Sequence, residues 1–191
     1  MQAARGTSLS DATVPHPSGS TSPRRARLTA LFAVVALAAY AVDLGTKVLA
    51  VSRLSGRSDV SVVGEVLVLH LTRNPGAAFS TGTEYTVALT CVAMVAVLVV
   101  VYLSRRVGSV GWAVALGLLL AGVAGNLTDR LFRAPGPFRG HVIDFLMLPH
   151  WPVFNVADMC INVAAVLILV QASRGIRING QPTADHREKS A

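Results

Sequence analysis

The stretch LTALFAVVALAAYAVDLGTKVLAV, residues 28–51, decides the fold of this chain. It is apolar over almost its whole length and carries only one acid and one base, Asp43 and Lys47. A helix rises about 1.5 Å per residue, so about 20 such residues cross a hydrocarbon layer roughly 30 Å thick. The stretch therefore predicts a transmembrane helix.

A cleavable secretory signal is the alternative for this stretch. Basic residues precede it, and the string Ala38-Ala39-Tyr40-Ala41 offers small residues for cleavage. The apolar pattern resumes after Asp43, however, over residues 48–51. This continuation favours a membrane helix over a mature N-terminus.

Three further apolar runs have a similar length, at about residues 85–103, 110–129 and 154–171. We predict an all-α membrane protein in which one domain, residues 28–173, contains four transmembrane helices. β-Branched residues between positions 60 and 71 predict a strand or hairpin, which would form a small extracytoplasmic β element. The segments 1–27 and 174–191 are expected to be cytoplasmic tails, with the polar ends of the chain disordered.

Arginine clusters predict the direction of the four helices, because basic residues accumulate in cytoplasmic loops. The two opposite loops also carry six arginines, but those are less tightly clustered at helix ends. Both termini are therefore expected to be cytoplasmic. The clusters precede the first helix, separate the second from the third and follow the fourth, and consist of Arg24, Arg25, Arg27, Arg105, Arg106, Arg174 and Arg177.

The net charge of +7 would suit nucleic acid, but the arginines lie beside apolar runs without a basic helix face. We expect no nucleic-acid partner. Cys91 and Cys160 lie inside apolar runs and lack metal-ligand spacing. The scattered His70, His141 and His150 match no metal or nucleophile motif. No metal site is therefore expected.

Four of the ten acidic residues lie in or beside the predicted helices. Such placement is unusual, because a charged side chain at the bilayer centre costs about 2.5 to 3.5 kcal/mol on insertion scales. Asp43 and Lys47 are four residues apart and are expected to pair on one helix face. Alternating helix directions place all four acids on the extracytoplasmic side, namely Asp43, Asp129, Asp144 and Asp158.

Paired carboxylates are the chemistry that these residues suit best. Two acids that share a site do not both ionise easily, so one takes a proton from water while the other, protonated, polarises a carbonyl. Asp144 and Asp158 flank a short connection and are the best placed to meet, with Asp129 as the alternative partner. Asn126 and Asn155 accompany the acids at helical spacing and would orient them by hydrogen bonds.

Five short motifs, in this order along the chain, resemble those of the lipoprotein signal peptidases, also called signal peptidase II. Each motif is weak alone, but five in order at matching helix ends are specific, and the resemblance extends over about residues 28–171. The motifs are Asp43-Leu-Gly-Thr-Lys47, Asn74-Pro-Gly-Ala-Ala-Phe-Ser80, Gly125-Asn126-Leu-Thr-Asp129-Arg130, Val142-Ile-Asp144-Phe145 and Phe154-Asn155-Val-Ala157-Asp158.

The resemblance implies an aspartic endopeptidase of the bacterial inner membrane that requires no metal or other cofactor. It implies that Asp144 and Asp158, near the extracytoplasmic face, cleave prolipoproteins before a diacylglyceryl-modified cysteine, and that the antibiotic globomycin occupies the site. A monomer surrounded by membrane lipids is expected. The residues expected to bind substrate or support the site are Asp43, Lys47, Asn74, Gly76, Phe79, Asn126, Asp129, Arg130, Phe145, Asn155 and Ala157.

Structural roles are alternatives for several of these residues. Asp43 with Lys47 is expected to be an ion pair rather than a catalytic group. Asp129 with Arg130 suits a helix-end anchor as well as a substrate contact. The aromatic residues near the extracytoplasmic face suit interfacial anchors as well as a lipid-binding wall, and they are Phe79, Phe145 and Trp151.

Two other functions would use similar residues. A transporter or proton channel also places acids in helices, but its relay should continue across the bilayer, whereas residues 95–101 and 163–170 are wholly apolar. A lipoprotein-binding protein without activity would need most of the same groups except the paired acids.

Overall fold

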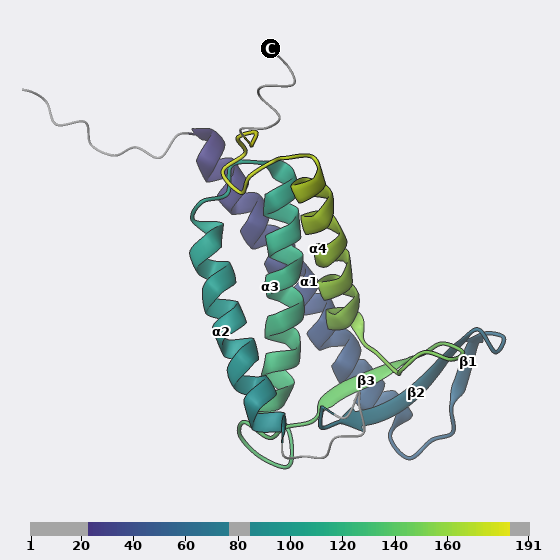
Figure 1. Ribbon diagram of the computed structural model, residues 1–191. Coiled ribbons are helices and arrows are strands. Elements are labelled where there is room, and N and C mark those ends of the chain that lie inside the picture. Colours follow the sequence, from purple (N-terminus) through teal and green to yellow (C-terminus); the bar gives the residue numbers. More distant parts are fainter. Residues whose placement is uncertain (1–22, 77–84, 184–191) are drawn as a thin grey trace, which may run out of the picture.

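The computed structural model describes residues 23–76 and 85–183 and places four long helices beside one small sheet (Figure 1). The four helices are long and apolar enough to cross a membrane, so the chain is a multi-pass membrane protein as predicted. The elements follow the chain in the order α1 (Pro23–Leu54), β1 (Val60–Val63), β2 (Leu67–Asn74), α2 (Thr86–Ser104), α3 (Val110–Phe132), β3 (Val142–Met147) and α4 (Val156–Ser173).

Helix α3 lies at the centre of the bundle and contacts each of the other three helices. Half of an 18-residue apolar stretch of α3 is buried inside the protein, compared with 17 to 22% of the corresponding stretch in each of the other helices. Small residues let neighbouring helices approach its backbone closely, as is common in membranes. The outward faces of α2 and α4 expose Leu98 and Leu169, which suit contact with lipid. The buried small residues of α3 are Ala113, Ala115, Gly117, Ala121, Gly122 and Gly125.

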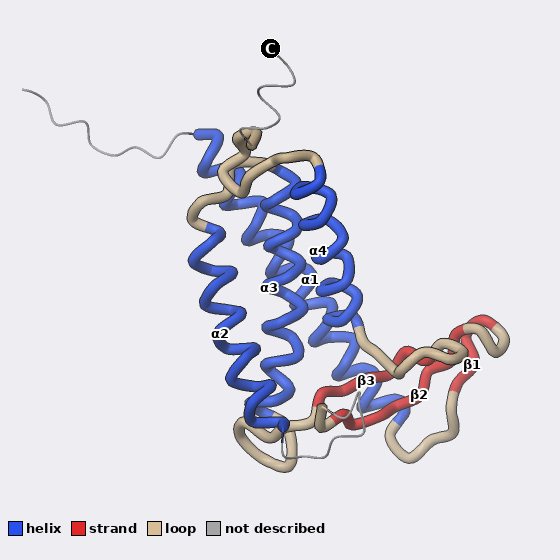
Figure 2. The backbone as a smooth tube through the Cα atoms, viewed as in Figure 1, coloured by secondary structure: helices blue, strands red, loops and turns tan. Residues whose placement is uncertain are grey.

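The three strands form an antiparallel sheet in the order β1-β2-β3 at one end of the bundle (Figure 2). The predicted hairpin is confirmed by β1 and β2, whereas no strand is predicted from the sequence where β3 lies. Its partner strand is distant in sequence, since Thr72 pairs with Asp144, so local patterns did not reveal the pairing. Ile143 and Phe145 of β3 pack against Ala50 of α1 and attach the sheet to the bundle.

Two predicted boundaries differ from the observed ones. Helix α1 begins at Pro23 rather than near Leu28, so part of the predicted N-terminal tail is helical. Proline suits the first turn of a helix, where its missing N–H has no partner to lose. The chain after α4 also continues in ordered form, because Ile176 bridges Pro182 and Ile178 packs on the core. The remaining parts of both predicted tails lie outside the described residues.

Candidate active site

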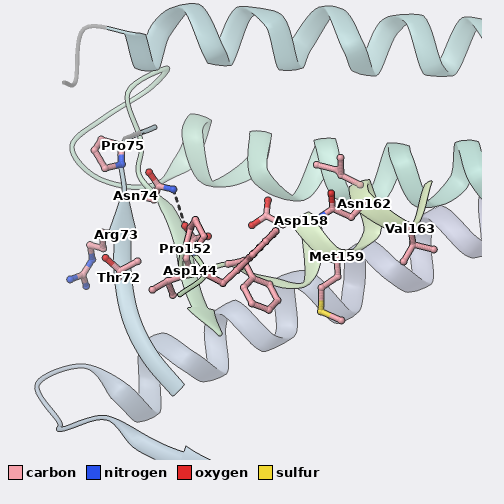
Figure 3. A pocket seen from close by; sticks show the side chains of 14 residues that line it. Thr72, Arg73, Asn74, Pro75, Asp144, Pro152, Asp158, Met159, Asn162 and Val163 are labelled. Atoms are coloured by element: carbon pink, nitrogen blue, oxygen red, sulfur yellow. Dashed lines mark hydrogen bonds between the residues drawn. The ribbon is translucent and has the colours of Figure 1, made fainter. Parts of the chain in front are cut away.

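Two aspartates line a cavity of about 770 Å³ beside the sheet. Asp144 extends from β3 and is almost fully buried, whereas Asp158, in the first turn of α4, is partly exposed. Figure 3 shows both side chains close to the end of β2. Apolar side chains form much of the remaining wall, namely Trp151, Pro152, Val153, Phe154, Met159, Ile161 and Val163.

Asn155, the residue before α4, contacts both aspartates. Its Nδ2 donates to Asp144 Oδ1 at 2.6 Å, and its backbone N–H donates to Asp158 Oδ2 at 3.2 Å. Its own Oδ1 accepts from the backbone N–H of Asp158 at 3.0 Å, which completes a capping box at the start of α4. Because Asn155 is fully buried, one well-fixed residue positions both acids.

A second donor to Asp144 comes from the end of β2. Asn74 Nδ2 donates to Asp144 Oδ2 at 2.9 Å, and Asn74 Oδ1 accepts from the backbone N–H of Gly76 at 2.8 Å. Gly76 has a φ of 111°, and a Cβ there would lie 2.6 Å from Leu89 Cδ1. The turn that orients Asn74 therefore requires glycine.

Burial controls the ionisation of Asp144. Removal of this carboxyl from water raises its pKa from 3.8 to about 6, and the nearby charge of Asp158 acts in the same direction. Hydrogen bonds from Asn74 and Asn155 and the charge of Lys47 lower the pKa and limit the rise. These hydrogen bonds come from neutral amides, so they orient the acid without cancelling its charge.

A second pair of aspartates lies between α1 and α3 and surrounds Lys47. Lys47 Nζ is 2.9 Å from Asp43 Oδ2 and 3.0 Å from Asp129 Oδ2, and all three side chains are at most 1% exposed. Asp129 also pairs with Arg133 and accepts from the backbone N–H of Ile143 at 3.2 Å. The predicted pairing of Asp43 with Lys47 is thus confirmed. We call Asp43, Lys47, Asp129 and Arg133 the Lys47 cluster.

Asn126 on α3 connects the Lys47 cluster to the cavity. Its Oδ1 accepts from Lys47 Nζ at 2.9 Å, and its Nδ2 donates to Asp158 Oδ1 at 2.8 Å. Asn155 Nδ2 also donates to Asn126 Oδ1 at 3.2 Å. An ammonium group can only donate, so Lys47 holds the oxygen of Asn126 toward itself and the NH₂ group toward Asp158.

Ala157 and Arg130 act on the backbone around the site. The N–H of Ala157 donates to Asp43 Oδ1 at 2.8 Å, which attaches the start of α4 to α1. Arg130 donates from a guanidinium nitrogen to the carbonyl of Pro75 at 3.5 Å, a long contact to the turn after β2. Asp129, in contrast, is a buried member of the Lys47 cluster, and its burial favours the alternative of a helix-end anchor over a substrate contact.

Phe145, which is predicted to bind substrate or support the site, does not line the cavity. Phe145 packs in the apolar core with Leu54 and Ile143 instead. Successive side chains of a strand point to opposite faces, so the neighbours of Asp144 on β3 turn toward the helices. Phe79 lies outside the described residues. Trp151 does line the cavity, and it is 62% exposed.

Sequence patterns alone missed the strand that carries Asp144 and the partner of Asp129. The β-branched Val142 and Ile143, followed by Phe145, were the available signal for a strand. Arg133 follows Asp129 by four residues, the spacing that lets two side chains meet on a helix. Both signals are present in the sequence.

The polar side chains that line this cavity are two acids, two amides, one hydroxyl and one guanidinium, namely Asp144, Asp158, Asn74, Asn162, Thr72 and Arg73. Within residues 23–76 and 85–183, no three side chains of His, Cys, Asp or Glu are placed together to hold a metal ion. Cys91 is exposed on α2 and Cys160 is buried on α4. The fold and the site define a multi-pass membrane protein with a pair of aspartates at one end of its helical bundle.

Comparison with known proteins identifies the family of this chain. Residues 35–174 match the family described as signal peptidase (SPase) II. A lipoprotein signal peptidase of Mycobacterium avium (strain 104) is 48% identical over 156 residues, which cover 81% of this chain and 86% of the relative. One of Streptomyces coelicolor (strain ATCC BAA-471 / A3(2) / M145) is 45% identical over 154 residues, covering 81% and 75%.

A solved structure of a bacterial membrane enzyme has the same fold, with a TM-score of 0.66. It is 23% identical and covers 75% of this chain and 92% of its own. The chain belongs to the signal peptidase II family, whose members are aspartic peptidases that process prolipoproteins. This membership favours the peptidase over the transport and binding alternatives.

Proposed function

We propose that Asp144 and Asp158 form the catalytic pair and hydrolyse the peptide bond before a diacylglyceryl-modified cysteine. The observation that carries this proposal is that both acids line one cavity and are held by a single buried residue, Asn155. The aspartates of the Lys47 cluster, in contrast, are closed off by ion pairs and lie outside the cavity lining.

The two acids have different environments, which supports a division of roles. Burial raises the pKa of Asp144 to about 6, so this acid holds its proton more firmly than an ordinary aspartate. Asp158 lies in the first turn of α4, where the helix dipole favours negative charge. We therefore assign Asp158 as the base and Asp144 as the acid.

In the proposed reaction, ionised Asp158 takes a proton from a water molecule as the water oxygen attacks the scissile carbonyl carbon. Protonated Asp144 donates its proton to the carbonyl oxygen, which gives a neutral tetrahedral intermediate. The intermediate collapses when Asp158 returns its proton to the leaving amine and Asp144 recovers its proton from a hydroxyl group. Both acids regain their starting states.

The apolar wall of the cavity supports a substrate that carries acyl chains. Met159, Ile161 and Val163 continue from the acids along α4, so a lipid attached to the residue beside the scissile bond would follow this wall. Figure 3 shows Met159 and Val163 extending along α4 away from Asp144. We assign the residues that shape or bind the substrate as Asn74, Gly76, Asn126, Arg130, Asn155 and Ala157, supported by the Lys47 cluster.

We further propose that the sheet and the two acids lie on the extracytoplasmic side of the bacterial inner membrane. The described chain ends lie together at the other end of the bundle, beside the arginine clusters (Figure 1). One chain supplies both acids and their donors, which supports a monomer as the active form.

The test is a gel-shift assay of purified protein with a diacylglyceryl-modified prolipoprotein and with the same precursor unmodified. We expect the wild type to cleave only the modified precursor, and globomycin to block cleavage. Asp144→Asn should abolish cleavage while its unfolding temperature does not fall below that of the wild type. Asp59→Asn is the matched control, because Asp59 is an exposed acid that pairs with His70 outside the cavity.

Cleavage of the unmodified precursor at an equal rate would contradict the proposed lipid contact. Cleavage of the modified precursor by well-folded Asp144→Asn would contradict the assignment of the catalytic pair.

A further inference from the structure

Positive charge is concentrated at the end of the bundle that is opposite the sheet. The acids of the described residues all belong to the sheet region or to the helix halves beside it. Seven arginines lie at the opposite end without a described acid among them. They are Arg24, Arg25, Arg27, Arg105, Arg106, Arg174 and Arg177.

Three of these arginines surround a cavity of about 390 Å³ between the start of α1 and the turn that joins α2 to α3. The turn residue Val107 is buried, and Leu28 forms the apolar floor of this region. The residues that line the cavity are Arg24, Arg25, Leu28, Arg106, Val107, Gly108 and Asn179. We call this cavity the basic pocket.

The guanidinium groups of the basic pocket are held by neutral acceptors. Arg24 donates to the carbonyl of Gly108 at 3.0 Å, and Arg25 donates to the carbonyl of Arg105. Arg106 donates to the hydroxyl of Tyr102 at 2.7 Å, with its guanidinium carbon 5.1 Å from the ring centre. These contacts fix the three groups in position, and no acid within residues 23–76 and 85–183 forms an ion pair with them.

The segment after α4 closes one side of the basic pocket. The N–H of Gly108 donates to the carbonyl of Ile178 at 2.8 Å, and Trp112 Nε1 donates to the carbonyl of Ile176 at 2.9 Å. A Cβ on Gly108 would lie 1.9 Å from the carbonyl oxygen of Asn179, so this close contact requires glycine. The wall formed by Asn179 is therefore built into the fold.

A second cavity, of about 490 Å³, adjoins the basic pocket and is lined mainly by apolar groups. The two cavities share Arg106 and Asn179, so they meet at these side chains. Leu103, Trp112 and Ile178 form part of the apolar lining. An occupant of both cavities would need an anionic head joined to an apolar chain.

We propose that this end of the bundle binds an anionic glycerophospholipid. Its phosphate is held by Arg24, Arg25 and Arg106, and the start of an acyl chain contacts Trp112 in the second cavity. Guanidinium groups suit phosphate through charge-assisted hydrogen bonds, and basic pockets between transmembrane helices bind anionic head groups. Arginines that only orient helices need no cavity and no fixed side-chain positions.

The test uses fluorescence of Trp112 in the full-length chain, reconstituted in phosphatidylcholine nanodiscs. The chain has two tryptophans, so Trp151→Phe leaves Trp112 as the only one. Phosphatidylglycerol with brominated acyl chains is added, and we expect it to quench Trp112 more strongly than brominated phosphatidylcholine at the same mole fraction. Removal of one basic-pocket arginine should weaken the preference about fivefold.

Arg106→Gln and Arg24→Gln are the two test variants, from different helices, so that a folding defect in one leaves the other informative. Arg174→Gln is the matched control, because Arg174 is an exposed arginine at the same end that lines neither cavity. We expect the control to keep the full preference and both test variants to show the fivefold weaker one.

Equal quenching by the two brominated lipids would overturn the proposal, as would an equal loss in Arg174→Gln and the test variants. Suppression of the preference by inorganic phosphate at constant ionic strength would identify a site for free phosphate instead of a lipid. The assay measures no cleavage, so its result is independent of the proposed catalytic pair.

Discussion

Two pairs of aspartates lie in the same half of this protein, and they differ in what stands between them. Asp43 and Asp129 share the ammonium group of Lys47, and all three side chains are at most 1% exposed. Asp144 and Asp158 share Asn155 instead, and both line a cavity. Two cations, Lys47 and Arg133, neutralise the first pair, whereas an amide only orients the second.

This difference explains how one small bundle contains four aspartates with separate roles. Removal of one partner from a buried ion pair leaves an uncompensated charge, which is costly. Separation of α1 from α3 would break the pair between Lys47 and Asp129 in this way, so the Lys47 cluster holds the two helices together. The donors around Asp144 and Asp158 are neutral amides, so they do not cancel the negative charge of either carboxylate. Each of the two acids therefore affects the ionisation of the other. Asn126 connects the two pairs, because Lys47 fixes the orientation in which it donates to Asp158.

The largest expected effect comes from removing the shared cation of the first pair. Lys47→Met should lower the free energy of unfolding by about 3 to 5 kcal/mol, because Asp43 and Asp129 lose their shared partner. Detergent-induced unfolding measures this change. Arg53→Met, at an exposed base in the last turn of α1, is the control and should change little. Unchanged stability of Lys47→Met would remove the distinction between the two pairs.

The pH dependence of stability tests the second pair. The pKa of Asp144 is raised to about 6 in the folded protein, compared with 3.8 for an ordinary aspartate. The folded state therefore binds the proton more tightly, and the unfolding free energy falls as pH rises from about 4 to about 6. Its pH-dependent part should amount to about 3 kcal/mol at most, since one pKa unit is about 1.4 kcal/mol.

Asp144→Asn removes this titration, so the stability difference between variant and wild type should grow over that pH range and stay constant above it. Unfolding measured at several pH values checks the trend. A difference that does not vary between pH 4 and 6 would show that the carboxyl of Asp144 is not held in its protonated form.

Asn155 has two functions that substitutions can separate. Asn155→Ser keeps a side chain that caps α4 but is too short to reach Asp144, whereas Asn155→Ala loses both contacts. We expect both variants to lose about 100-fold in kcat/KM, because the two acids are misplaced. Only Asn155→Ala should lose an additional 1 kcal/mol or so of stability. Normal activity in Asn155→Ser would show that its bond to Asp144 is dispensable.

The smallest expected effect concerns the link between the pairs. Asn126→Leu should lower kcat/KM about tenfold, because Asp158 loses one charge-assisted hydrogen bond worth roughly 1.5 kcal/mol. Thr128→Val is the control on the same helix. The hydroxyl of Thr128 forms hydrogen bonds with the Tyr40 hydroxyl and with the backbone carbonyl of Ala124, and neither bond involves the two pairs. An equal loss in the two variants would point to a general defect in α3.

Much of this architecture could be predicted from the sequence, because long apolar runs have few alternatives. The four helices and the hairpin of β1 and β2 follow from local patterns, and the pairing of Asp43 with Lys47 follows from their spacing. The pairing of β3 with β2 could not be predicted in this way, since it joins residues such as Thr72 and Asp144 that are far apart in the chain.

The contacts within the site depended on this missing pairing. The amides of Asn74, Asn126 and Asn155 were expected near the acids, but which amide meets which carboxylate depends on how β2, α3 and α4 are arranged. The burial of Phe145 likewise follows from the face of β3 that meets the bundle. Spacing along one element predicts its neighbours on that element only.

The most direct measurement compares Asp158→Asn with Asp129→Asn, one aspartate from each pair, for both processing rate and unfolding temperature. Asp158→Asn should lose processing of the modified precursor by several orders of magnitude and keep its unfolding temperature. Asp129→Asn should unfold at a lower temperature while its folded fraction still processes the precursor. Processing by Asp158→Asn near the wild-type rate, or a stable Asp129→Asn without activity, would contradict the separation of the two pairs.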